Sequence, residues 1–265
     1  MNNDQWQAFS KIRSSFKTYC INSLTQLGEK YISPYESFEH QNNQNQNNQN
    51  SPLKNAILSS FDASQPSYAV ETPLVYNHAL DEISTASEIE LILVTDNPGR
   101  EEQKCENQRY LVGQAGKICN AFFSKHPELK IDFRSCVIVL NKSIIHTPKT
   151  HNLTTLLKNF PYLLQFFQKD QKTQAQFALS LASLFNCPLW ISGYSELKTK
   201  GLFASYADTI REALHTMPKA DIYLYQHFSR NCFSIQLKKE YDASLSLQEN
   251  LQVIGLNNRK RILGI

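Results

Sequence analysis

The spacing of hydrophobic residues divides the chain into an N-terminal helical stretch, a polar tract and a longer body. Apolar side chains recur mostly at steps of three and four, at Trp6, Phe9, Ile12, Phe16, Tyr19, Ile21, Leu24 and Leu27. This spacing predicts an amphipathic helix that ends at Gly28. We expect its apolar face to pack on the body of the protein. The alternative is a helix that contacts a partner or DNA.

The polar tract follows this helix. Residues 41–50 consist entirely of asparagine and glutamine, and Ser51 and Pro52 come next. A segment without apolar side chains cannot offset the entropy lost on ordering, so we predict a disordered linker over residues 41–52. It separates an N-terminal helical arm, residues 1–40, from a body formed by residues 53–265.

From Ile89 onward, short apolar runs alternate with helical stretches. The runs are rich in branched or aromatic side chains and span residues 89–94, 136–140, 188–191 and 222–225. The helical candidates span residues 114–125, 152–168, 171–185, 202–215 and 232–240. Strands separated by helices require crossover connections and therefore a mostly parallel sheet that is covered on both faces. The pattern predicts an α/β protein, a three-layer α/β/α sandwich with a central sheet of about four strands.

Composition and charge exclude several classes of protein. The chain has 265 residues, with 27 lysines and arginines against 24 aspartates and glutamates, and a net charge of +3. This balance excludes an acidic-tail protein and a histone-like polycation. Because no apolar run approaches the roughly 18 to 20 residues of a membrane span, and no basic stretch precedes an apolar one at the N-terminus, we expect a cytoplasmic protein without membrane contact. Nothing indicates an oligomer, so a monomer is the default expectation.

Cysteine usage gives a separate prediction. The six cysteines are scattered, and none forms a CxxC pair; they are Cys20, Cys105, Cys119, Cys136, Cys187 and Cys232. Such spacing predicts free, mostly buried thiols rather than disulfides or a metal site.

Polar residues directly follow each predicted strand. Residues 95–99 read Thr-Asp-Asn-Pro-Gly after the first run, Asn141 follows the second, and residues 227–229 read His-Phe-Ser after the last. Ligands of parallel α/β sheets lie beyond the carboxyl ends of the strands. A glycine-bearing loop over residues 110–116 precedes a helical stretch, where exposed amides can hold an anion. Each element taken alone is also an ordinary turn or cap, and only their joint placement favours a cleft.

These motifs resemble those of the uracil-DNA glycosylase superfamily. Residues 93–102, Leu-Val-Thr-Asp-Asn-Pro-Gly-Arg-Glu-Glu, are similar to its first motif, and residues 111–116, Leu-Val-Gly-Gln-Ala-Gly, to its uracil-pocket loop. Asn141 falls where the family has the asparagine of its post-strand motif, and residues 227–229 resemble its terminal His-Pro-Ser. The resemblance covers roughly residues 88 to 240 and is closest to the iron-sulfur branch of bacteria and archaea.

The resemblance implies an activity and catalytic residues. Members of the superfamily hydrolyse the N-glycosidic bond of uracil or a related deaminated base in DNA, the first step of base-excision repair, without a cofactor in the monofunctional case. Asn97 would position the attacking water, and His227 would donate to the oxygen of the departing base. Asp96 stands where the iron-sulfur branch has glutamate and ranks below Asn97. The partner is then DNA that contains a damaged or deaminated base.

The same resemblance assigns the binding residues. Asn141 would pair with the uracil edge and exclude cytosine, while Tyr110 or Leu111 would cover the face of the base beside Gly113. A second set would contact the DNA backbone or enter the vacated stack, and it comprises backbone amides near Gly99, together with Ser229 and Arg230.

Departures from the family pattern motivate an alternative function. Thr95 replaces a glycine, Leu111 a phenylalanine and Phe228 a proline, which favours a catalytically degenerate protein of the same fold that binds nucleic acid or protein. Asn97 favours retained chemistry, because the mismatch-specific and single-strand-selective branches have asparagine there. A nucleotide-binding α/β enzyme of unrelated chemistry is a third, more remote reading.

The iron-sulfur cluster of the closest branch is not expected in this chain. That branch needs an upstream CxxC and a cysteine four residues after the motif asparagine. Here only Cys20 lies upstream, and position 145 is isoleucine, which cannot replace a thiolate ligand. We therefore predict no cluster and no bound metal.

Overall fold

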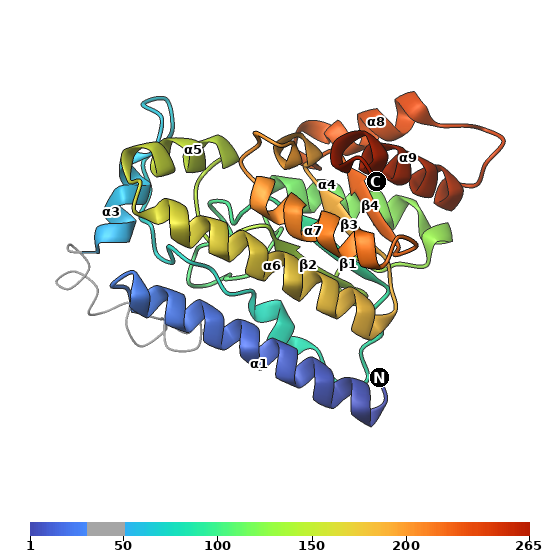
Figure 1. The fold of residues 1–265 in the computed structure, drawn as a ribbon, viewed down its shortest axis with the longest axis horizontal. Helices are drawn as coiled ribbons and strands as arrows, with labels where there is room; N and C mark the ends of the chain where they lie inside the picture. The colour runs from blue at the N-terminus through green and yellow to red at the C-terminus, as the bar shows by residue number, and fades with distance from the viewer. Residues whose placement is uncertain (31–50) are drawn as a thin grey trace.

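The computed structural model describes residues 1–30 and 51–265, and at its centre lies a four-stranded parallel sheet (Figure 1). The strands are β1 (Leu91–Thr95), β2 (Val137–Asn141), β3 (Leu189–Ser192) and β4 (Ile222–Tyr225). Their spatial order is β2-β1-β3-β4, and every neighbouring pair is parallel. Helices flank the sheet, so the predicted α/β/α sandwich is confirmed.

The strand register brings the carboxyl ends of the strands to one level. Thr95 is the partner of Asn141 across β1 and β2, and Ser192 is the partner of Tyr225 across β3 and β4. Because all strands run the same way, the segments that follow them start from a common edge of the sheet. This register is what allows residues far apart in the sequence to meet.

Two layers of helices cover the two faces of the sheet. One layer contains α1 (Asn3–Gln26), α6 (Leu163–Phe185) and α7 (Ala204–Thr216). The other contains α4 (Gln114–Lys125), α8 (Cys232–Glu240) and α9 (Leu247–Leu263). Ile92 belongs to the hydrophobic cluster of the first layer, whereas its neighbour Leu93 belongs to that of the second. The alternation of side chains along a strand thus divides one apolar run between two cores.

Shorter elements complete the connections. Two further α-helices are α3 (Pro52–Ser59) and α5 (Thr150–Asn159). Short 3₁₀ turns are η1 (His78–Glu82), η2 (Pro127–Leu129), η3 (Tyr194–Leu197) and η4 (Ser229–Asn231).

The observed helices differ from the predicted ones in two places. The break predicted between residues 168 and 171 is wrong: it lies at Pro161, so that α5 ends at Asn159 and α6 runs unbroken from Leu163. Proline lacks the amide hydrogen and disfavours helical backbone before it, which explains this position. Helix α9 was not among the predicted elements, although Ser246 and Glu249 form a capping box at its start.

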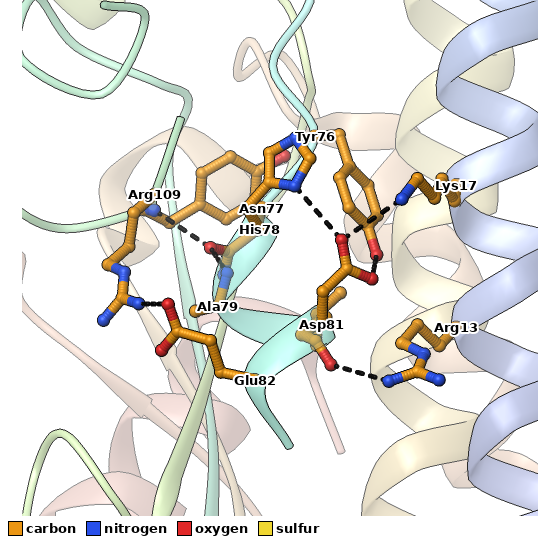
Figure 2. Close-up of polar contacts among 11 residues, drawn as sticks. Arg13, Lys17, Tyr76, Asn77, His78, Ala79, Asp81, Glu82 and Arg109 are labelled. Atoms are coloured by element: carbon orange, nitrogen blue, oxygen red, sulfur yellow. Dashed lines mark hydrogen bonds and ion pairs between the residues drawn. The ribbon is translucent and has the colours of Figure 1, made fainter. Parts of the chain in front are cut away.

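Helix α1 packs on the body, as expected for its apolar face. It lies alongside α6 in Figure 1, and Phe16 and Leu24 belong to the same core cluster as residues of β1. Polar contacts orient the helix against η1: the Lys17 ammonium lies 3.2 Å from Asp81 Oδ2, and Arg13 donates to the Leu80 carbonyl at 3.4 Å (Figure 2). The described part of the predicted arm is therefore integrated into the core.

A buried carboxylate joins this helix to the sheet. Asp170 of α6 accepts hydrogen bonds from the Tyr19 hydroxyl at 3.0 Å, the Ser143 hydroxyl at 2.7 Å and the Ile144 amide at 2.9 Å. Burial raises the pKa of Asp170 to about 6, although these donors oppose the rise. One side chain thus connects α1, α6 and the segment that follows β2.

The predicted linker meets the described residues only at its end. Residues 41–50 lie outside the described part of the chain. Ser51 and Pro52, placed in the linker from the sequence, instead begin α3: the Ser51 hydroxyl caps the helix by accepting from the Lys54 amide at 3.1 Å, and Pro52 is its first residue. Among the described residues, no helix has both the length and the apolarity needed to cross a bilayer.

Candidate functional site

A cleft of about 800 Å³ opens where the strands end, and residues from several loops line it. Most of the predicted site residues meet there: Asp96, Asn97, Gly99, Leu111, Gly113, His227, Ser229 and Arg230. Asn141 and Tyr110 do not line the cleft. The geometry therefore brings together the residues of three separate motifs and leaves two predicted base contacts outside.

The His227 ring is held in one orientation by the residue two positions later. Its Nδ1 accepts a hydrogen bond from the Ser229 amide at 3.0 Å and lies 2.8 Å from the Ser229 hydroxyl. Burial lowers the pKa of His227; the Asp96 carboxylate opposes this shift and the Lys142 ammonium adds to it. At neutral pH the ring is uncharged, and because Nδ1 is an acceptor, its proton resides on Nε2. The cleft thus contains a neutral imidazole donor.

The loop after His227 has an unusual backbone. Arg230 and Asn231 both adopt left-handed conformations, with φ of 54° and 57°. Left-handed backbone at two successive residues other than glycine costs conformational free energy, and it persists only where packing against neighbouring residues stabilises it. Phe228 supplies part of that support, since its ring is fully buried and stacks on Phe233 with centroids 4.4 Å apart. Arg230 is consequently fixed at the cleft with its side chain exposed.

Asn97 is oriented by acceptors that surround its amide nitrogen. Its Nδ2 donates to the Thr147 hydroxyl at 3.0 Å and to the Ile145 carbonyl at 3.2 Å. No described residue donates to its Oδ1. The amide oxygen is therefore an acceptor available to a water molecule in the cleft, although an amide is too weak a base to deprotonate it.

Asp96 has a buried partner, Lys142, that is not among the predicted site residues. Its Oδ1 accepts from the Lys142 ammonium at 2.6 Å, and its Oδ2 accepts from the Thr150 hydroxyl at 3.2 Å. Lys142 is fully buried and also donates to the Ser192 carbonyl; burial lowers its pKa, which Asp96 opposes. Gly193, with φ of 80°, leaves room for Asp96 because a Cβ there would collide with the carboxylate. Both Asp96 oxygens are thus engaged, which suits a fixed negative charge better than a general base.

One signal in the sequence pointed to Lys142. A lysine directly after an apolar strand, and next to a predicted site residue, occupies a position where burial is expected and charge is unusual.

Glu102 joins the two glycine-bearing loops of the cleft. The Gly99 amide donates to Glu102 Oε2, and the amides of Leu111, Val112 and Gly113 also act on this carboxylate. Burial raises the pKa of Glu102, and these amides oppose the rise. The loop amides expected to hold an anion therefore hold the protein's own carboxylate. The Gly99 amide, which was predicted to contact DNA, donates to Glu102 instead.

Tyr110 does not reach the cleft, which contradicts its predicted role as a cover for the base. The side chain is 1% exposed, and its hydroxyl donates to the Val75 carbonyl at 2.5 Å. It borders a separate cavity of about 480 Å³ along the outer edge of β2. An aromatic ring with its hydroxyl satisfied is more stable in the core than in solvent. The chain turns at Leu111, whose φ is 55°, so that only Leu111 lines the cleft.

Asn141 also lies behind the cleft rather than in it. It is 1% exposed, and its Oδ1 accepts a hydrogen bond from the Thr95 hydroxyl. Thr95 itself lines the cleft. Asn141 is therefore not placed to pair directly with a base edge, as the resemblance implied, because its side chain is almost fully buried and does not line the cleft.

Charged side chains surround the opening of the cleft. Arg100, Lys149 and Arg230 line it and are exposed. The Arg100 guanidinium lies over the Tyr68 ring, 4.9 Å from its centroid, which limits its movement. Glu101 and Glu196 also line the cleft but are less exposed. The outermost charges are therefore positive.

All six cysteines carry free thiols, as predicted. Cys20, Cys105 and Cys119 are buried, whereas Cys136, Cys187 and Cys232 are only half-buried, so the prediction of mostly buried thiols holds for three of the six. The spacing could not reveal this difference. Among the described residues, no group of three histidine, cysteine, aspartate or glutamate side chains is placed to hold a metal ion.

Comparison of the chain with models of protein families and with curated proteins finds no match.

Proposed function

We propose that this protein hydrolyses the N-glycosidic bond between deoxyribose and uracil, or a related deaminated base, in DNA. The observation that carries the proposal is that Asn97 and His227, from loops at opposite ends of the motif-bearing region, line one cleft with complementary hydrogen-bonding groups. Asn97 offers an acceptor and His227 a neutral donor. Glycosidic hydrolysis of this kind needs one group for the water and one for the departing base.

The chemistry follows from these two groups. The target nucleotide leaves the stack and its base enters the cleft. As the bond between the anomeric carbon and the base nitrogen breaks, the electron pair leaves with the base, and negative charge develops on a base oxygen. A hydrogen bond from His227 Nε2 to that oxygen stabilises the charge, and a neutral donor needs no proton transfer to do so. The water loses one proton as its oxygen bonds to the anomeric carbon, and the departed base anion gains one, so that the products are the free base and an abasic site.

Asp96 and Asn97 act on the sugar and on the attacking water. Positive charge develops on the sugar while the bond breaks, and the Asp96 carboxylate supplies a fixed negative charge in the cleft. Asn97 Oδ1 accepts a hydrogen bond from the water that attacks the anomeric carbon. Because Asn97 only orients this water, we assign it a positioning role in the attack.

Binding of DNA is assigned to the exposed cations around the opening. Arg100, Lys149 and Arg230 are suited to contact phosphates on either side of an extruded nucleotide. With a net charge of +3, we expect the protein to contact few DNA phosphates. We expect log affinity to fall with log salt with a slope of about −3, as three phosphate contacts imply.

A uracil-containing oligonucleotide tests the proposal, with cleavage of the abasic site by mild alkali as the readout. The wild type should release uracil, and Asn97→Ala combined with His227→Ala should reduce the rate by about 10³-fold or more, since each group supports the transition state. A matched double control, Asn55→Ala with His126→Ala, alters the same residue types away from the cleft and should retain the rate. The absence of product with every deaminated base, in single and double strands, would refute the proposal. Activity that survives in the cleft variant would refute the site.

A second candidate function is supported by a different observation. Both Asp96 oxygens are engaged within the protein, and Tyr110 and Asn141 lie outside the cleft. These features favour a protein of the same fold that binds nucleic acid or protein without catalysis. It predicts an oligonucleotide complex without product, and binding that weakens when Arg100 and Arg230 are replaced by glutamine.

A further inference from the structure

Thr95 lines the cleft at the carboxyl end of β1. It is the last residue of β1 and the partner of Asn141, the last residue of β2. In neighbouring parallel strands, residues in register point to the same face of the sheet. Thr95 lines the cleft, whereas Asn141 does not, and both are nearly inaccessible to solvent. A ligand approaching this strand end therefore meets Thr95 first.

The direction of the hydrogen bond defines what Thr95 offers to a ligand. Its hydroxyl proton is donated to Asn141 Oδ1. A hydroxyl has one proton and two lone pairs, so with its proton committed Thr95 Oγ1 presents only acceptor capacity. The same contact uses one of the two lone pairs of Asn141 Oδ1. Any hydrogen bond that a ligand makes to Thr95 must then come from a donor on the ligand.

We propose that Thr95 is a specificity-determining residue of the cleft, which selects a deaminated base over its parent by accepting a hydrogen bond from the ring N–H that deamination creates. Cytosine has a lone pair at N3, and uracil has a proton there. Adenine has a lone pair at N1, and hypoxanthine has a proton there. An acceptor at this position favours the deaminated base in both cases, because the unaltered base would place a lone pair against a lone pair.

This inference rests on the proposed function and specifies the feature that its substrates share. The shared feature is a lactam N–H, which is present in pyrimidines and purines. A cleft of about 800 Å³ has room for either ring system. Uracil and hypoxanthine are therefore both expected substrates, whereas cytosine and adenine are not.

Free bases test the recognition separately from catalysis. The probes are 1-methyluracil, which keeps N3–H, and 1,3-dimethyluracil, which lacks it, and binding is measured by saturation-transfer NMR. We expect the wild type to bind 1-methyluracil at least 10-fold more tightly than the dimethyl compound. Thr95→Val, which has nearly the same shape but no acceptor, should reduce this ratio to about 1, whereas Thr95→Ser should retain it. Ser192→Ala is the control, since this neighbouring buried hydroxyl does not line the cleft.

Excision assays then apply the same variants to oligonucleotides with uracil or hypoxanthine. Thr95→Val should lower both rates by about 10- to 100-fold, and Thr95→Ser should restore them to within about threefold. If the wild type does not bind 1-methyluracil, or binds both probes equally, the inference is wrong even if uracil is excised. If the probes are discriminated through Thr95 but no base is excised, the inference stands and the proposed function fails. The wild-type comparison needs no variant, so a folding defect in Thr95→Val does not remove the test.

Discussion

Replacing Asp96 by asparagine leaves the Lys142 ammonium buried without its carboxylate. Lys142 is fully buried, and its remaining described hydrogen-bond partner is the Ser192 carbonyl. Removing one member of a buried pair costs about 3–5 kcal/mol, because the other charge stays desolvated. Lys142→Met leaves the charge on Asp96 instead, whose side chain is 13% exposed and keeps the Thr150 hydrogen bond. Water relieves part of this penalty, so we expect about 2–3 kcal/mol.

The double variant Asp96→Asn with Lys142→Met separates the pair from its surroundings. With both charges absent, no unpaired charge remains buried. The loss in the free energy of unfolding should therefore be smaller than the sum of the two single losses by about 2–3 kcal/mol. Urea denaturation of the wild type and the three variants at pH 7 measures each free energy of unfolding.

The loss in the free energy of unfolding caused by Asp96→Asn should also become smaller at alkaline pH. Burial already lowers the pKa of Lys142, and without the opposing carboxylate it falls further, so the folded variant carries a neutral amine before the unfolded chain does. Strictly additive costs, or an Asp96→Asn variant within 1 kcal/mol of the wild type, would refute the assignment of a coupled buried pair.

Three further predictions concern stability. Burial lowers the pKa of His146 from 6.5 to about 4, so its stabilising contribution, about 3 kcal/mol, is present above pH 6.5 and is lost as the pH falls towards 4. Urea titrations of His146→Gln between pH 7 and 4 should show a smaller loss than the wild type. A parallel loss would contradict the shift. The pKa of Asp170 is raised from 3.8 to about 6, so its contribution is present below pH 3.8 and lost as the pH rises through 6. The stability of Asp170→Asn relative to the wild type should therefore be about 3 kcal/mol more favourable at pH 7 than at pH 3.5, and a difference independent of pH would refute this. Gly116→Ala places a Cβ against the Leu111 carbonyl, and we expect thermal unfolding to show a loss of about 2–4 kcal/mol in the free energy of unfolding. Gly28→Ala meets no neighbour within 4 Å, so it carries only the strain of a φ of 76° and should lose less.

The local pattern of apolar residues was sufficient to predict those helices and strands whose formation depends mainly on their own side chains. The predicted bounds of β4, α4 and α8 agree with the structure, because an apolar run or an amphipathic period is a property of consecutive side chains. The same holds for α1, whose apolar face packs as its spacing indicates. The break between α5 and α6 is also a local property, because Pro161 disfavours helical backbone in the residue before it.

The cleft could be predicted in part for a similar reason. Residues that directly follow parallel strands must start at one edge of the sheet, so Asn97 and His227 were expected to meet from their positions alone. The orientation of side chains in the longer loops could not be predicted in this way. Tyr110 and Leu111 are neighbours in one motif, and the left-handed turn at Leu111 sends only one of them to the cleft.

By itself the sequence determined the fold class, the strands, and the set of polar residues at the strand ends, because these follow from periodicity and from chain direction. Tertiary structure decided which of those residues face the cleft and in what state. The pairing of Thr95 with Asn141, the ammonium of Lys142 behind Asp96, and the carboxylate of Glu102 between two loops all join residues distant in the sequence. Burial and hydrogen-bond direction depend on every neighbour in space, and those neighbours are brought together only by the completed fold.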